Sequence, residues 1–132
     1  MLYCLDTNFV ISVIRKESKA ISNLASHNVQ DIKIPEVVRA ELLTGCLKSA
    51  RPTIQRAKVE HVIKPFELLG FEGKAVEYYA SIRCKLEETG KVIGPNDLLI
   101  AAISRAHNAI LVTSNVKEFQ RVPDLLVENW TR

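Results

Sequence analysis

Short apolar runs alternate along the chain with longer stretches in which apolar residues recur every three or four positions. The short runs predict β-strands at about 2–5, 31–34, 66–69, 109–113 and 125–128. The longer stretches predict helices at about 8–16, 18–27, 36–49, 52–63, 72–89 and 97–107. Strands that alternate with helices are typical of βαβ units, so we expect an α/β fold with a mostly parallel central sheet of four to five strands.

Length and composition are those of one globular domain. The 132 residues are 47% hydrophobic and 25% charged, which excludes a disordered chain, and no linker divides them. We therefore expect a single domain over residues 1–132. Cysteines 4, 46 and 84 are far apart and lie within apolar patterns, which predicts small core residues in a reducing compartment.

The chain shows no targeting or membrane-spanning segment. Its N-terminal apolar run is interrupted by Asp6 and Asn8, and the longest uninterrupted apolar run is 98–103. We expect a cytoplasmic protein with no membrane partner. The formal charge of +3 permits a polyanionic partner without requiring one, because Lys and Arg are scattered along the chain.

Two acids interrupt stretches that otherwise have the composition of a core. Asp6 directly follows the first predicted strand, and Asp97 opens the helix predicted at 97–107. A charge in such a place costs several kcal/mol unless it is paired or bound to a metal. In an open α/β sheet, ligands bind at the carboxyl ends of the strands, which both acids reach. Glu41, in the helix after the second strand, reaches the same edge.

The neighbours of Glu41 on its helix are Val37, Val38, Thr44 and Gly45, so we expect its side chain to point into a cleft. Asn115 and Glu118 follow the fourth predicted strand and could extend the acidic cluster. Each acid alone has a plainer explanation as a helix cap, and Asn115 as a turn residue. A capping role explains any one acid taken alone, but it explains less well why three acids converge on one edge.

Carboxylates gathered in this way favour Mg²⁺, with Mn²⁺ as a second candidate, because hard cations prefer oxygen ligands. Histidine pairs at metal-binding spacing and Cys-x-x-Cys are absent, as are glycine-rich phosphate loops and the Gly-x-Ser-x-Gly elbow. Metal-dependent displacement at a phosphodiester, with water as the nucleophile, is the chemistry that this residue set favours.

Four segments in fixed order also carry a resemblance to a known family. They are Leu5-Asp6-Thr7-Asn8, Glu41-Leu42-Leu43-Thr44-Gly45, Gly94-Pro95-Asn96-Asp97-Leu98-Leu99-Ile100-Ala101-Ala102 and Leu111-Val112-Thr113-Ser114-Asn115-Val116-Lys117-Glu118-Phe119, and the chain closes in Val127-Glu128-Asn129-Trp130. The set is similar to PIN-domain ribonucleases of the VapC toxin family nearly from end to end.

The resemblance implies a PIN-like three-layer α/β/α sandwich and a Mg²⁺-dependent endoribonuclease toxin of a type II toxin–antitoxin pair. It implies a VapB-like antitoxin, a homodimer and an RNA substrate, with transfer RNA and the initiator anticodon loop as the expected target. Asp6, Glu41 and Asp97 match the family's metal-binding catalytic acids. The family's fourth acidic position falls at Asn115, which keeps an oxygen ligand but no charge, and Glu118 could compensate.

Two other functions remain open at this stage. One is a phosphatase of the haloacid-dehalogenase type, in which Asp6 would be the nucleophile, although Asn8 stands where such enzymes need a second aspartate. The other is a non-catalytic PIN-like binding module that keeps its acids for a structural cation or for a basic partner segment.

Overall fold

A computed structural model describes all residues from 1 to 132 and contains a single five-stranded sheet. Its strands are β1 (Tyr3–Leu5), β2 (Ile32–Pro35), β3 (Glu67–Leu69), β4 (Ile110–Val112) and β5 (Val127–Glu128). The strand order is β3-β2-β1-β4-β5, and every neighbouring pair is parallel. The predicted parallel sheet is confirmed, with β1 at its centre.

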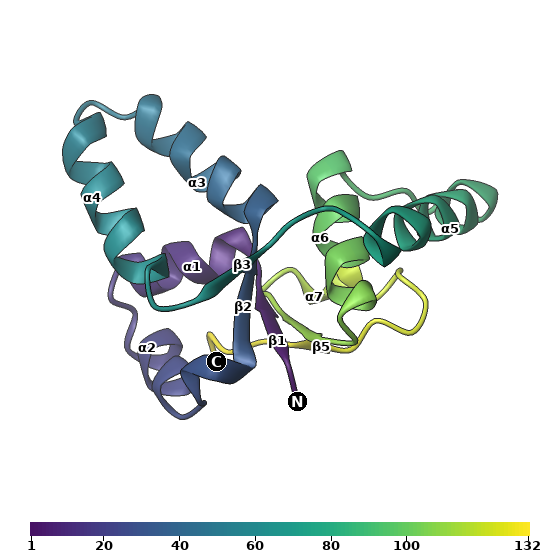
Figure 1. Cartoon of the computed structure of the whole chain (residues 1–132), viewed down its shortest axis with the longest axis horizontal. Coiled ribbons are helices and arrows are strands. Elements are labelled where there is room, and N and C mark those ends of the chain that lie inside the picture. The colour runs from purple at the N-terminus through teal and green to yellow at the C-terminus, as the bar shows by residue number, and fades with distance from the viewer.

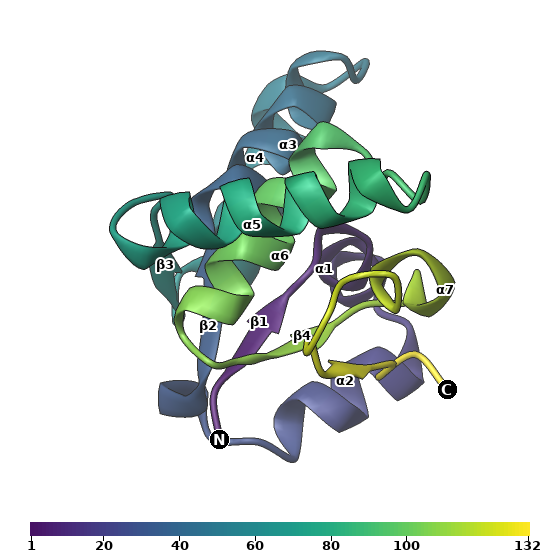
Figure 2. The ribbon, with the colours of Figure 1, turned by 90° about the vertical axis from the view of Figure 1, so that its right-hand side faces the viewer.

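Helices connect the strands and cover both faces of the sheet. They are α1 (Thr7–Ile14), α2 (Ser18–Ala25), α3 (Glu36–Leu47), α4 (Pro52–Ile63), α5 (Lys74–Glu88), α6 (Pro95–Ala106) and α7 (Val116–Phe119), with a short 3₁₀ turn at Val29–Asp31. Figures 1 and 2 show α1 to α4 on one face and α5 to α7 on the other. This division follows from right-handed crossovers, because the chain moves outward from β1 to β3 and then returns past β1 to β4. The predicted three-layer α/β/α sandwich is confirmed.

The sheet is short and apolar because it is covered on both faces. Cys4, Leu5, Ile34, Leu111 and Val112 are at most 1% exposed. They belong to one hydrophobic cluster of 28 buried residues. Parallel strands buried in this way have apolar side chains on both faces rather than an alternating pattern.

Helix α6 is the most buried helix, in agreement with the long apolar run in its sequence. Ala101, Ala102 and Ser104 are fully buried, since α6 lies between the sheet and α5. The helix begins at Pro95, two residues earlier than the pattern predicted, because proline suits the first helical position. Asp97 therefore lies in the first turn and not at the start of the helix.

Aromatic packing fixes the C-terminal end of the chain. The Trp130 ring stacks on His27 with centroids 4.1 Å apart and also contacts Tyr3 and Phe9. The Asn23 side chain donates a hydrogen bond of 2.8 Å to the Trp130 carbonyl. These contacts attach the segment after β5 to α1 and α2.

One prediction about the cysteines is wrong. Cys4 and Cys46 are buried as expected, but Cys84 is exposed on the outer face of α5. Ile82 and Leu86 form the buried side of that helix, and a residue midway between them turns away from it.

No helix in the structure combines the length and the apolar character needed to cross a membrane.

Candidate active site

Asp6 lies at the carboxyl end of the central strand and is only 3% exposed. Its backbone N–H continues the sheet by donating to the Val112 carbonyl at 2.9 Å, and the residue then becomes the N-cap of α1. Oδ1 accepts the Thr7 N–H at 2.8 Å, and Oδ2 accepts the Thr113 hydroxyl at 2.6 Å. Asp6 is thus a helix cap, as the plainer explanation proposed, but the cap occupies only one of its oxygens.

Glu41 reaches the same edge from α3. Its Oε1 accepts a 2.7 Å hydrogen bond from the hydroxyl of Thr7, and its side chain is partly buried. Thr7 therefore contacts both acids, one through its N–H and the other through its hydroxyl. The expected direction of Glu41, into the molecule and away from bulk water, agrees with this contact.

Asp97, Glu118 and Asn115 form the other side of the cluster. The Asn115 amide donates to Oε2 of Glu118 at 2.8 Å, and the Gly94 N–H approaches Oε1 of Glu118 at 3.3 Å. Glu118 also shares a hydrogen bond with the Asp97 carboxyl. The short helix α7 and the loop that precedes α6 are joined through these contacts.

The ionisation of these acids is coupled across the sheet edge. Burial raises the pKa of Asp97 to about 7, with further increases from the bond to Glu118 and from the negative charges of Asp6, Glu118 and Glu41. Burial also raises the pKa of Asp6, an increase that its bonds to Thr113 and Thr7 oppose. The Asn115 amide in turn lowers the pKa of Glu118. Burial and the neighbouring negative charges thus favour the protonated form of Asp97, whereas the Asn115 bond favours the ionised form of Glu118.

The carboxylates do not form a closed metal cage. No group of three or more His, Cys, Asp or Glu side chains is arranged so that it could hold a metal ion. Their oxygens instead accept hydrogen bonds from Thr7, Thr113 and Asn115, which offset the repulsion among like charges. The donor set is nevertheless all oxygen and anionic, as hard divalent cations require, so the residues fit Mg²⁺ or Mn²⁺ in chemical type.

Comparisons with known proteins show the family of the chain. A family model described as the PIN domain matches residues 3–125. A ribonuclease VapC2 of Rickettsia felis is 40% identical over the full length of both chains. The chain is a PIN-domain protein of the VapC family. A tRNA(fMet)-specific endonuclease VapC of Salmonella typhimurium is 31% identical to this VapC-family chain, with 97% of each chain covered.

Solved structures place this VapC-family chain in the same group. A crystal structure of VapBC2 from Rickettsia felis, bound to a DNA fragment from its promoter, is similar with a TM-score of 0.91 and 40% identity. The match covers 98% of this chain and 99% of the other. DNA-bound VapBC from Salmonella typhimurium gives a TM-score of 0.93 at 32% identity, with 98% and 99% of the two chains covered.

The sequence pattern did not identify two hydroxyl groups of the VapC-family site. Thr113 is fully buried at the end of β4, where it donates to Asp6 and accepts the Asn115 N–H at 3.0 Å. Thr7 joins Asp6 to Glu41. Their position directly after parallel strands was a usable signal, because every strand of such a sheet ends at this edge.

Proposed function

We propose that this VapC-family chain is a Mg²⁺-dependent endoribonuclease toxin, with Mn²⁺ as an alternative cation. The observation that carries the proposal is the hydrogen-bonded network of acids at one sheet edge. Thr7 joins Asp6 to Glu41, Thr113 joins Asp6 to Asn115, and Asn115 binds Glu118 beside Asp97. The ribonuclease names of full-length relatives at 31–40% identity support RNA as the substrate.

The residues of this chain have different roles at the proposed cation site. Asp6, Glu41 and Asp97 would hold the ion, and Asn115 and Glu118 flank them. When bound, a divalent cation supplies Lewis-acid polarisation of the scissile phosphoryl group. Thr113 and Thr7 fix the direction of the Asp6 carboxylate, and Thr7 fixes that of Glu41. Because the pKa of Asp97 is raised to about 7, protons would compete with a cation for its oxygens near neutral pH.

Transfer RNA is the substrate we favour, with the initiator anticodon loop as the specific target. The name of the Salmonella typhimurium relative supports it. Three of the acids, Glu41, Asp97 and Glu118, also remain partly exposed at the sheet edge. An open edge suits a polymer better than a small phosphate ester, which an enclosed pocket would bury. The phosphatase alternative also lacks an acid at Asn8.

A VapB-like antitoxin is the partner we propose, because solved structures similar to this chain include VapBC complexes. We also propose a homodimer. Exposed apolar side chains near the start of α5 favour it: Phe71 is 41% exposed and Val76 is 49% exposed. Light scattering of the purified chain, alone and with its antitoxin, tests both assemblies.

The decisive test of activity uses purified protein, freed of any bound partner, and total transfer RNA. We expect cleavage that needs Mg²⁺ and stops with EDTA. Asp6→Asn and Asp97→Asn should abolish it while circular dichroism stays unchanged, and Glu77→Gln on α5 serves as the matched acid-to-amide control. Cleavage by both site variants at the wild-type rate would refute the assignment, and tight Mg²⁺ binding without cleavage of any RNA would favour a binding module.

A further inference from the structure

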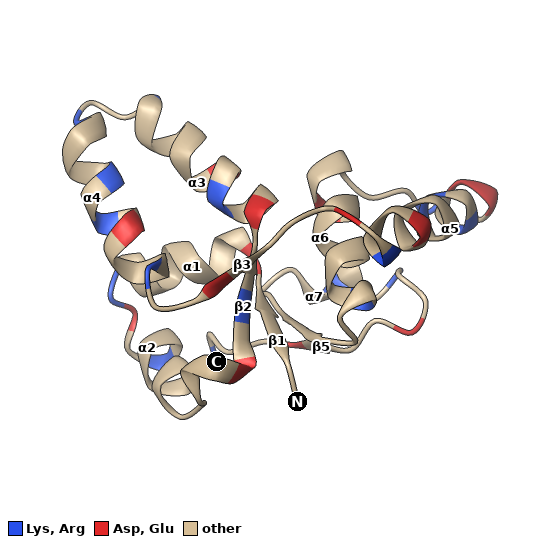
Figure 3. Ribbon diagram, in the orientation of Figure 1, with Lys and Arg blue, Asp and Glu red and all other residues tan.

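The hairpin formed by α3 and α4, residues 36–63, carries five cationic side chains and three acids, a formal charge of +2, and the acids Glu36 and Glu41 lie in the first half of α3. Positive charge is therefore concentrated in the part of the chain after Glu41. Residues 42–66 include five cationic side chains and one acid, a formal charge of +4, whereas the whole chain carries +3. The cationic residues are Lys48, Arg51, Arg56, Lys58 and Lys64, and all are exposed. Figure 1 shows this hairpin projecting from the sheet, and Figure 3 shows blue segments along α4 and at its connection to α3.

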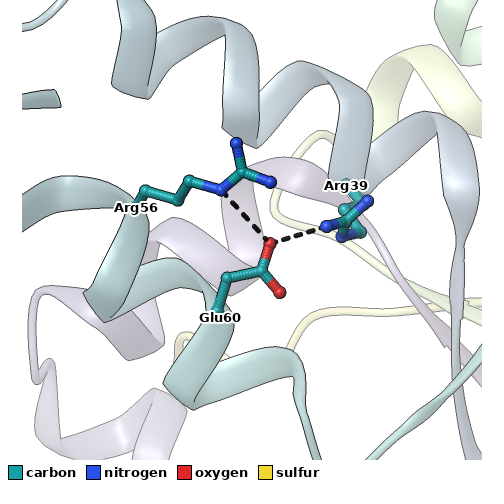
Figure 4. Close-up of polar contacts among 3 residues, drawn as sticks. All are labelled: Arg39, Arg56 and Glu60. Atoms are coloured by element: carbon teal, nitrogen blue, oxygen red, sulfur yellow. Dashed lines mark hydrogen bonds and ion pairs between the residues drawn. The ribbon is translucent and has the colours of Figure 1, made fainter. Parts of the chain in front are cut away.

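Two of the hairpin's arginines are already paired. Oε1 of Glu60 lies 2.8 Å from Nη2 of Arg39 and 4.0 Å from Nε of Arg56 (Figure 4). This cluster ties α4 to α3. The ion pairs of the structure involve neither Lys48 nor Arg51, which lie at the tip of the hairpin. These two cations are therefore available to a partner.

Lys48 also lies on the same side of α3 as Glu41. The positions 41, 44, 45 and 48 follow the helical spacing i, i+3, i+4 and i+7, so they share one face. Seven residues of helix extend about 10 Å, which places Lys48 roughly one Debye length from the acid cluster at 0.1 M salt. Thr44 and Gly45 between them are exposed and small, and open space surrounds the Gly45 Cα.

We propose that Lys48 and Arg51 bind backbone phosphates of the RNA strand whose neighbouring phosphodiester lies at the acid cluster. The proposal rests on the proposed nuclease function and names the surface that holds its substrate. A cluster of acids repels a polyanion, so substrate binding needs unpaired cations close by. The four positions from Glu41 to Lys48 on this face carry no apolar side chain, and the exposed apolar residue beside them is Leu47, which is 75% exposed. Two unpaired cations next to a polar face suit a phosphate backbone.

The test compares two double variants of the full-length chain. Lys48→Gln with Arg51→Gln removes the proposed contacts. Lys74→Gln with Lys85→Gln removes the same formal charge from exposed positions on α5, on the other side of the sheet. The probe is a short fluorescein-labelled single-stranded RNA in EDTA, and its dissociation constant is measured by anisotropy over a series of salt concentrations. Unfolding curves of both variants verify the fold.

We expect the α3–α4 variant to bind the RNA on the order of tenfold more weakly at low salt. The negative slope of log K against log salt should become less steep by about 1.4, since two phosphate contacts are lost and each contributes about 0.7 on a single strand. The α5 variant should retain the wild-type slope. Equal losses in both variants would overturn the proposal, because they would indicate a general effect of net charge.

Two further outcomes separate this surface from the nuclease function. If wild-type protein binds RNA through Lys48 and Arg51 but cuts no RNA, the surface stands and the proposed activity fails. If wild-type protein cuts RNA and the α3–α4 variant binds and cuts equally well, the activity stands and the surface proposal is overturned. Normal RNA binding with loss of antitoxin binding in that variant would also overturn it, in favour of a protein partner.

Discussion

The hydroxyl of Thr113 donates a 2.6 Å hydrogen bond to Oδ2 of Asp6, across 107 residues of sequence, in a fully buried position. The same hydroxyl oxygen accepts the Asn115 N–H at 3.0 Å. With the Thr7 N–H on Oδ1, both oxygens of the most buried acid have a donor. The two strand ends that form the site are thus joined by a side-chain contact as well as by the sheet.

Replacement of Thr113 by valine should destabilise the protein. Valine has nearly the same shape, so the change leaves a buried carboxylate oxygen and the Asn115 N–H without a partner. Loss of the hydroxyl also raises the pKa of Asp6 further, because the Thr113 bond normally lowers it. We expect the free energy of unfolding in urea to fall by about 1–3 kcal/mol at pH 8. Thr113→Ser, which keeps the hydroxyl, is the control, and equal stability of the two variants would contradict the prediction.

The ionisation of Asp97 should make stability depend on pH. Its pKa is about 7 in the folded chain, against 3.8 as the ordinary value. The folded state therefore binds a proton more strongly than the unfolded state between these values, and the free energy of unfolding falls as pH rises through about 4 to 7. Asp97→Asn should flatten this dependence and be more stable than wild type at pH 8. Urea unfolding over a pH series tests this, and parallel curves for the two proteins would count against it.

Divalent cations should stabilise the folded protein. An ion that binds only the folded state at about 100 times its Kd adds about 2.7 kcal/mol to the free energy of unfolding. We expect Mg²⁺ to raise the Tm of the wild type and of Glu77→Gln, and to have little effect on Asp6→Asn. Sodium chloride at matched ionic strength separates site binding from screening. An equal rise of Tm in all three proteins would place the bound Mg²⁺ elsewhere.

Most of the fold could be predicted from the sequence because its elements have strong patterns. Each strand is a short apolar run, and the two helices predicted at 72–89 and 97–107 correspond to α5 and α6. The parallel order of the strands then brought Asp6, Glu41 and Asp97 to one edge without any knowledge of side-chain positions. Cys84 was predicted wrongly because the apolar residues near it, Ile82 and Leu86, lie on the opposite face of α5.

The details of the site could not be predicted in the same way. The contact between Thr7 and Glu41 depends on side-chain rotamers on two helices, and the contact between Gly94 and Glu118 depends on the path of a loop. Patterns of residue type contain neither kind of information. The approach of the acids to one edge could be predicted, but not that their oxygens would accept hydrogen bonds from Thr7, Thr113 and Asn115 rather than form a closed set of metal ligands.

The amide at Asn115 provides the sharpest test of how the site balances its charge. Its Nδ2 donates to Oε2 of Glu118 at 2.8 Å, and this bond is the main cause of the low pKa of Glu118. Asn115→Asp replaces the donor with a second carboxylate, so repulsion should raise the pKa of Glu118 and lower the free energy of unfolding in EDTA by about 1 kcal/mol.

In Mg²⁺ the same substitution should have the opposite sign, because an added carboxylate strengthens binding of a hard cation. We expect Asn115→Asp to bind Mg²⁺ more tightly than wild type in calorimetry and to gain more stability from it. Asn115→Ala removes the donor without adding charge, so it should lose stability in EDTA and gain no affinity. If the aspartate and alanine variants bind Mg²⁺ with the same affinity, residue 115 lies outside the cation site and its role is confined to holding Glu118.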